Sequence, residues 1–243
     1  MNKPVNYDWF SLDRDTLFTM MFLAHDRVVN QKLTVDQLHR KLTNQIKKFI
    51  PVKCKKVLDK TVEKSWVYVG GAYYSDLDED GERAIEVNFN YNPKDKDLII
   101  NSKRFGRMCM TFADTVLHEI IHMRQHRRRN FKIIPDYPST ASRTRQRESQ
   151  QYLGNRDEID AYAFNSACEL HERFSGKKTK IINYLNTSHS GAGKRTCSFV
   201  MYLKAFGHNH RHPIIKKYKK KIVSYLPQAE VGKPYRNSEW INY

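Results

Sequence analysis

The chain has few cysteines, few acidic side chains relative to basic ones, and no long apolar run. Its four cysteines, Cys54, Cys109, Cys168 and Cys197, are scattered without a C-x-x-C pair, which excludes a zinc ribbon and favours reduced thiols over disulfides. The apolar stretch 16–24 follows acidic residues and is too short to span a bilayer, so it is neither a signal peptide nor a transmembrane helix. We therefore expect a cytoplasmic protein without a membrane partner.

Charge is the unusual feature of an otherwise globular composition. Lys and Arg number 43 against 26 Asp and Glu, a formal net charge of +17, which favours a polyanionic neighbour such as nucleic acid or an acidic protein. A hydrophobic fraction of 40% with 12% aromatic residues argues against disorder. The 243 residues suit one large domain or two small ones, and we predict a single domain over 1–243.

The motif that organises the chain is His118-Glu119-Ile120-Ile121-His122, the pattern H-E-x-x-H. Two histidines four residues apart lie on one face of a helix, so that their ring nitrogens can meet on one zinc ion. The glutamate is turned by roughly 100° from the first histidine, where it can act on a water molecule without binding the metal. The alternative is an ordinary amphipathic helix that happens to carry two histidines.

A zinc site needs a third protein ligand, and the neighbouring residues do not supply one. His126 lies about 12 Å from His118 along a helix, whereas zinc bonds are about 2 Å long. The extended pattern H-E-x-x-H-x-x-G-x-x-H also fails, because Gln125 and Arg128 replace its glycine and last histidine. The ligand must therefore come from another element.

The best candidate is Glu158, in a second predicted helix that Asn155 caps and whose apolar residues recur at helical spacing. Ala161 and Ala163 are small enough to allow a close approach to the first helix. The alternative is that the acidic first turn only complements the helix dipole.

His118-Glu119-x-x-His122 followed by Glu158-x-x-Ala161 resembles the gluzincin branch of zincin metallopeptidases, whose second helix supplies a glutamate ligand. It is also similar to small phage-encoded and SprT-like or repressor-cleaving zincins, which would imply a location in the host cytoplasm or the virion if the protein is phage-encoded. The resemblance covers about 85–170. The Asp or Asn of the family that orients a zinc histidine is Tyr162 here, so Asp157, Asp160 or Tyr162 is expected to take that role.

The expected fold class is α+β and zincin-like, with a small mixed or antiparallel sheet packed against helices. Helices are predicted over 13–30 and 34–50. Strands are predicted over 52–58, 65–74 and 84–91, which are rich in β-branched and aromatic residues, and in the last of these apolar and polar residues alternate strictly. The domain thus divides into N-terminal helices (1–50), a sheet (52–100), metal-binding helices (106–172) and a basic helical extension (177–243). The resemblance implies an edge strand that binds the substrate backbone, for which 84–91 is the candidate, with Glu86, Asn88 and Asn90 beside the cleft.

Basic residues gather after the first metal-binding helix, and 134–149 is rich in Pro, Ser, Thr and Arg, as in a mobile loop. The alternative to a nucleic-acid contact there is a solvated surface. C-terminal helices are expected over 180–186, 196–206 and 213–226, the last with a basic face of lysines. The residues of the candidate nucleic-acid contact are Arg124, Arg127, Arg128, Arg129, Arg143, Arg145 and Arg147.

Together these observations predict a zinc metalloendopeptidase. His118, His122 and Glu158 would hold Zn2+, and Glu119 would be the general base that takes the proton of the attacking water. An additional donor to the oxyanion is open among Tyr137, Tyr152, His171 and His189. Two alternatives remain: a nucleic-acid-binding or structural, phage-type protein whose peptidase activity is lost or incidental, and a peptidase dedicated to one protein, such as a repressor or a DNA-bound target.

Overall fold

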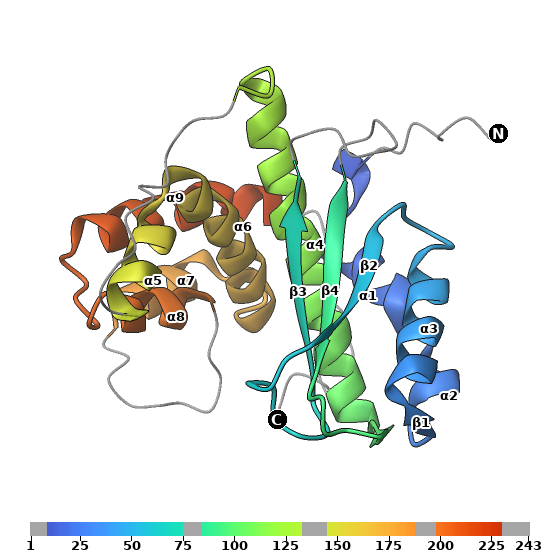
Figure 1. Cartoon of the computed structure of the whole chain (residues 1–243). Coiled ribbons are helices and arrows are strands. Elements are labelled where there is room, and N and C mark those ends of the chain that lie inside the picture. Colours follow the sequence, from blue (N-terminus) through green and yellow to red (C-terminus); the bar gives the residue numbers. More distant parts are fainter. Residues whose placement is uncertain (1–8, 75–83, 133–144, 188–197, 230–243) are drawn as a thin grey trace. The chain divides into compact units, whose positions relative to one another are not determined.

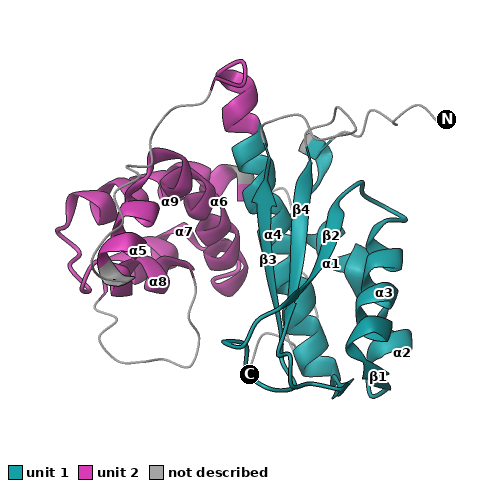
Figure 2. Ribbon diagram, in the orientation of Figure 1, with its two compact units in different colours: residues 1–123, 235–243 teal, residues 124–234 magenta. Residues whose placement is uncertain are grey.

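The computed structural model describes residues 9–74, 84–132, 145–187 and 198–229 (Figure 1). Its internal contacts divide the chain into unit 1, Met1–Met123 with Tyr235–Tyr243, and unit 2, Arg124–Pro234 (Figure 2). A single domain can contain two compact units, so the single-domain organisation stays a prediction.

Unit 1 opens with short helical elements: η1 (Trp9–Ser11), α1 (Arg14–Phe22) and α2 (His25–Val28). The Asp13 carboxylate accepts a hydrogen bond from the Thr16 backbone N–H and so caps α1. The prediction of a single helix over 13–30 is wrong. Val29 forms a bridge with Ile100, and the Asn30 N–H donates to the Ile100 carbonyl, so pairing between distant segments takes these residues out of the helix.

The helix α3 (Val35–Ile46) follows the short strand β1 (Lys32–Thr34). Thr34 and Gln37 form a reciprocal capping box, the local signal that starts this helix. Helix formation is confirmed, but α3 ends at Ile46, before the end predicted at residue 50. Strand β1 pairs with β5 (Asp97–Ile99), and neither strand was predicted, because three residues are too few to show a strand period.

The predicted strands form a three-stranded mixed sheet: β2 (Lys53–Leu58), β3 (Val67–Tyr73) and β4 (Ile85–Tyr91). The order is β2-β4-β3, with β4 parallel to β2 and antiparallel to β3. The expectation that 84–91 is an edge strand is therefore wrong, because β4 is central and hydrogen-bonds to neighbours on both sides. The edge strand next to β4 on its antiparallel side is β3.

One face of this sheet packs against the long helix α4 (Ser102–Arg128), which runs behind the strands in Figure 1. Gly71 of β3 marks the closest approach, because a Cβ placed there would lie 2.6 Å from Thr115 Cγ2 and 3.3 Å from Glu119 Cγ. Gly71 is in register with Val87, so Val87 shares this face and the alternating Glu86 row lies on the opposite one.

Glu86 is not exposed, as an outward-facing residue beside a cleft would be. It is buried, with 5% of its surface exposed, although strand alternation places it on the face away from α4. Its carboxylate forms an ion pair with Lys55 and accepts a hydrogen bond from the Tyr74 hydroxyl. The lysine and the tyrosine thus neutralise and satisfy a carboxylate that would be costly to bury alone.

Unit 2 is helical in its described part and contains the last turn of α4. It continues with α5 (Arg145–Gly154), α6 (Arg156–Arg173), α7 (Lys178–Asn186), α8 (Ser198–Ala205) and α9 (Pro213–Ala229). The three predicted C-terminal helices are confirmed over their described residues. The loop expected over 134–149 is wrong from Arg145 onward, where α5 begins, and 133–144 lie outside the described residues.

The core of unit 2 is an apolar cluster around α6, with α8 and α9 packed against it. It includes Ile159, Leu170, Phe199, Tyr202 and Tyr218. In the described ranges no helix combines the length and apolar character that crossing a membrane requires.

The close approach at Gly71 gives a stability prediction. Gly71→Ala should lower the free energy of unfolding by about 1–3 kcal/mol, since the new methyl group overlaps the Thr115 side chain. Gly70→Ala is the matched control, because its Cβ would have only ordinary contacts at 3.8 Å. Urea unfolding measures both variants, and equal stability of the two would contradict the packing of α4 on β3.

Candidate metal centre

The helix α4 carries the H-E-x-x-H motif in its most buried part. Asn101 precedes the helix and accepts a hydrogen bond from the Arg104 N–H, which satisfies one free donor of the first turn. From Val116 to Ile121 every residue is buried, including His118 at 7% and Glu119 at 6% exposure. Polar side chains in such surroundings need a partner or an ion.

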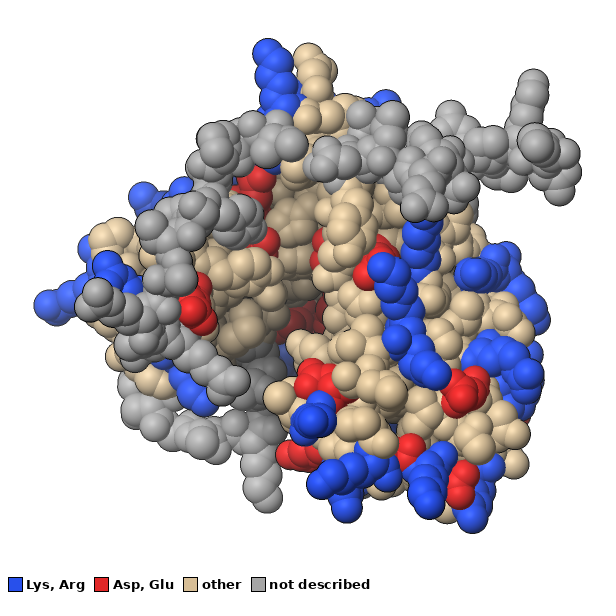
Figure 3. All heavy atoms as spheres, viewed as in Figure 1, with Lys and Arg blue, Asp and Glu red and all other residues tan. Residues whose placement is uncertain are grey.

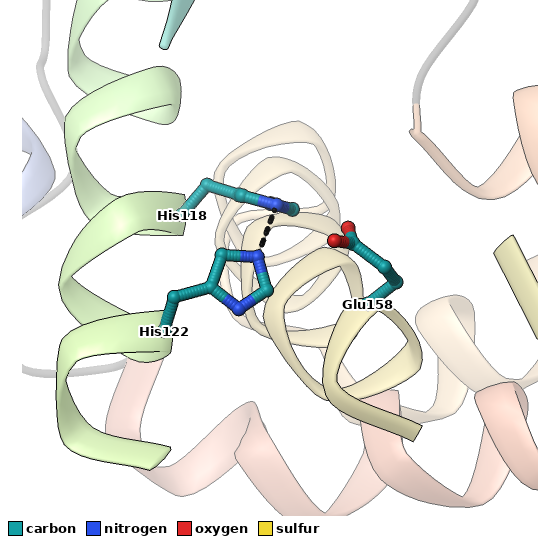
Figure 4. Close-up of side chains that lie close together, drawn as sticks. All are labelled: His118, His122 and Glu158. Atoms are coloured by element: carbon teal, nitrogen blue, oxygen red, sulfur yellow. Dashed lines mark hydrogen bonds between the residues drawn. The ribbon is translucent and has the colours of Figure 1, made fainter. Parts of the chain in front are cut away.

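His118 and His122 direct the same ring nitrogen toward each other. Their Nε2 atoms lie 3.0 Å apart, and the ring centroids are separated by 4.7 Å (Figure 4). Two nitrogens that share a tetrahedral zinc ion at bond lengths of about 2.0–2.1 Å are separated by about 3.3 Å. The helix therefore holds both rings near the geometry that one ion requires.

Glu158 completes the group from α6. The Asn155 side chain accepts a hydrogen bond from the Asp157 N–H, which starts the helix where the sequence predicts and fixes Glu158 in its first turn. Ligand atoms of His118, His122 and Glu158 all lie within 4.8 Å of one another, and Glu158 is 4% exposed (Figure 4). Rotation about the side-chain bonds of Glu158 can bring its carboxylate close enough to bind the same ion as the two histidines.

The composition of this group fits a metal ion. Two imidazole nitrogens and one carboxylate oxygen form one of the donor sets of catalytic zinc, and three protein ligands leave a coordination position for water. The group could therefore hold a metal ion. Glu119 lies between the two histidines in sequence and is not part of this group, consistent with a role other than that of a ligand.

Asp157, one residue before Glu158, is engaged elsewhere. Arg129 Nη1 lies 2.6 Å from Asp157 Oδ2 and 2.9 Å from Oδ1, and the Gln125 amide donates a hydrogen bond of 3.0 Å to the Asp157 carbonyl. These contacts tie the last turn of α4 to the first turn of α6. Asp157 is thus the counterion of Arg129 and positions both helix ends.

Asp160, the next acidic residue of α6, contacts α9. It accepts a hydrogen bond of 2.8 Å from the Tyr225 hydroxyl and forms an ion pair of 2.8 Å with Lys221. Burial acts to raise the pKa of Asp160, but hydrogen bonds from Lys221 and Tyr225 outweigh it and hold the pKa below the ordinary value. Asp160 therefore stays ionised at neutral pH and stabilises the packing of α9 on α6.

Tyrosines surround Glu158. Tyr152 of α5 hydrogen-bonds to Glu158 and also to Tyr162, and its ring makes an edge contact with the Tyr162 ring at 6.4 Å. Although 39% of Tyr152 is exposed, desolvation of its hydroxyl, followed by the nearby Tyr162 and Glu158, raises the pKa of Tyr152, so the hydroxyl keeps its proton. Tyr202 lies beyond, 5.6 Å from Tyr162 between ring centroids. Tyr162, which replaces the Asp or Asn of the resembled family, thus lies near Glu158.

Of the four candidate oxyanion donors, the structure brings Tyr152 to this group. The suggestion that His171 is an oxyanion donor is wrong, because thirteen residues along α6 place it about 20 Å from Glu158. Tyr137 and His189 lie outside the described residues. The contacts of Gln125, Tyr202 and Gly71 around this group were not predicted from the sequence, although the Gly70-Gly71 pair inside a strand pattern signals a close approach.

The arginines of the candidate nucleic-acid contact, here called the arginine track, differ in their surroundings. Arg129 is committed to Asp157, whereas Arg127 and Arg128 are exposed at the end of α4. Arg143 lies outside the described residues. Arg124, Arg145 and Arg147 lie in α4 and α5.

Comparison with known proteins identifies no relative: no protein-family model, curated protein or solved structure matches the chain. The resemblance to gluzincins therefore remains a hypothesis carried by the motif and by the proximity of His118, His122 and Glu158.

Removal of the candidate third ligand, Glu158, tests the proposed metal site. Glu158→Gln should weaken metal binding by at least about 10- to 100-fold, because the loss of a direct ligand exceeds the loss of its supporting contacts. Asp160→Asn makes the same chemical change two residues further along α6 and should weaken binding much less. Competition with a chromogenic chelator measures both affinities, and a larger loss in Asp160→Asn would refute the ligand assignment.

Tyr152 gives the second metal prediction. Tyr152→Phe removes the hydroxyl that hydrogen-bonds to Glu158 and should weaken metal binding by about tenfold, the lower end for supporting contacts. Tyr184→Phe is the control, since that hydroxyl accepts a hydrogen bond from Arg173 at another part of unit 2. If the two variants bind metal equally well in the same chelator competition, Tyr152 does not support the carboxylate.

Proposed function

We propose that the protein is a zinc-dependent metallopeptidase that hydrolyses peptide bonds. One observation carries the proposal: His118 and His122 of the H-E-x-x-H motif lie together with a buried Glu158 from another helix. A chance motif on an amphipathic helix requires no third donor at this place. The donor set supports zinc over magnesium or calcium, which prefer oxygen ligands.

His118, His122 and Glu158 would hold the ion through two nitrogens and one carboxylate oxygen. A zinc ion bound there would supply a Lewis acid that polarises the peptide carbonyl and lowers the pKa of a water molecule. Glu119 would accept a proton from the attacking water and deliver it to the leaving amine. Its burial at 6% exposure keeps this carboxylate away from bulk solvent.

The β3 strand supports a place for the substrate. It is an edge strand of the three-stranded sheet, and its Gly71 approaches Glu119 Cγ. An extended peptide that adds to β3 would form main-chain hydrogen bonds near the general base. The strand β3 thus takes the substrate-binding place that the sequence assigned to β4, which has no free edge. It also explains the glycine at position 71, because a side chain there would press against Glu119.

Separate losses of metal and of activity test the proposal. His118→Ala should lose bound zinc, whereas Glu119→Gln should keep stoichiometric zinc and lose cleavage, because the glutamate acts on water and is not a ligand. Elemental analysis of the purified proteins and a casein cleavage assay, with and without a chelator, separate these effects.

Two outcomes would contradict the proposal. Stoichiometric zinc in His118→Ala would refute the metal site, and full cleavage by Glu119→Gln would refute the role of the base. A protein that binds zinc but cleaves neither casein nor DNA-bound proteins would instead support the alternative of a zincin-type protein with lost activity.

A further inference from the structure

Positive charge is concentrated in unit 2. Between Arg124 and Pro234 the sequence has 23 Lys and Arg against 8 Asp and Glu, so this unit holds +15 of the formal net charge of +17. Unit 1 has nearly balanced charges, and on the face shown in Figure 3 its basic and acidic side chains lie intermixed. The imbalance therefore belongs to one unit and not to the chain as a whole.

The carboxylates of unit 2 do little to neutralise its surface. Asp157 pairs with Arg129, and Asp160 pairs with Lys221. Glu169 accepts hydrogen bonds from the backbone N–H and the hydroxyl of Ser198, which begins α8. Glu158 is buried in the metal group. Half of the eight acidic residues are thus committed to internal contacts.

Helix α9 presents the densest part of this excess. Ile215, Tyr218, Ile222 and Leu226 are buried in the core, so the helix is fixed by its apolar face. Lys216, Lys217 and Lys220 are exposed on the opposite side, because positions i, i+1 and i+4 share one side of a helix. We call these three residues the α9 lysine face.

The other lysines of α9 have internal partners. Lys221 pairs with Asp160, and Lys219 donates hydrogen bonds to Asn186 and to His210 Nδ1. Partial burial lowers the pKa of Lys219. Within the described part of the chain, Lys216, Lys217 and Lys220 form no ion pair, and α9 itself contains no acidic residue.

We infer that the α9 lysine face binds the phosphate backbone of nucleic acid. Flexible lysines on one side of a rigid helix act as point charges, which suit a regular polyanion and contact it without reading its sequence. A membrane surface fits less well, because the apolar side of α9 is buried in the core and cannot insert between lipids. The inference is independent of the proposed peptidase activity.

This surface is a better candidate than the arginine track at the end of α4. Arg129 is paired with Asp157 and helps to hold α4 against α6, so its replacement would disturb the structure as well as the charge. The α9 lysine face can be neutralised without the loss of an ion pair in the described residues. A change in binding would then report the surface contact alone.

The test compares two variants of the full chain that lose the same charge. Lys216→Gln, Lys217→Gln and Lys220→Gln together remove the α9 lysine face, whereas Lys48→Gln, Lys60→Gln and Lys64→Gln remove three exposed lysines of unit 1. Fluorescence anisotropy with a short labelled duplex DNA, at a series of salt concentrations, gives the slope of log affinity against log salt. Thermal melting followed by circular dichroism verifies that each variant is folded.

We expect the slope to become shallower by roughly two to three units in the α9 variant, since each phosphate contact contributes about 0.9, and by less than one unit in the control. Equal slopes in the two variants would overturn the inference, because total charge alone would then explain binding. Wild-type binding to vesicles that contain phosphatidylserine, lost in the α9 variant while DNA binding is unchanged, would also overturn it and assign the surface to a membrane.

Discussion

Burial of polar side chains in and beside the candidate metal group is the constraint on which the structure depends. His118, Glu119 and Glu158 are each less than a tenth exposed, and uncompensated burial of such groups would cost several kcal/mol. The imidazoles satisfy part of this requirement through their mutual contact at Nε2, and Tyr152 hydrogen-bonds to the carboxylate. A cation among His118, His122 and Glu158 would satisfy them together, since each of these side chains offers it a lone pair.

The surrounding structure keeps those side chains in place through contacts of two kinds. Near the middle of α4 the contact is steric: Gly71 has no side chain, so the strand β3 can lie close to Thr115 and Glu119. Arg14 adds a bidentate ion pair with Asp114, one turn before His118. At the end of α4 the contact is polar, because Gln125 and Arg129 bind the first turn of α6 through Asp157.

The acidic residues of α6 show how similar groups take different roles. Asp157, Glu158 and Asp160 lie within one turn of a helix, yet the first pairs with an arginine, the second joins the histidines and the third binds α9. Side chains that differ by about 100° of rotation face different neighbours, so their partners decide their chemistry. The same reasoning separates the exposed lysines of α9 from Lys219 and Lys221, whose partners lie within unit 2.

Local patterns in the sequence determined the α+β class, the three strands of the mixed sheet, the capping of α3 and α6, and the choice of His118, His122 and Glu158 as a group. These features depend on periodicity and on side chains a few residues apart, which a sequence displays directly. Only the tertiary structure decided that β4 is central, that Val29 and Asn30 leave the helix to pair near Ile100, and that Tyr152 of α5 lies beside Glu158 of α6. Strand order and contacts between distant segments depend on how whole elements pack, and no local pattern encodes that choice.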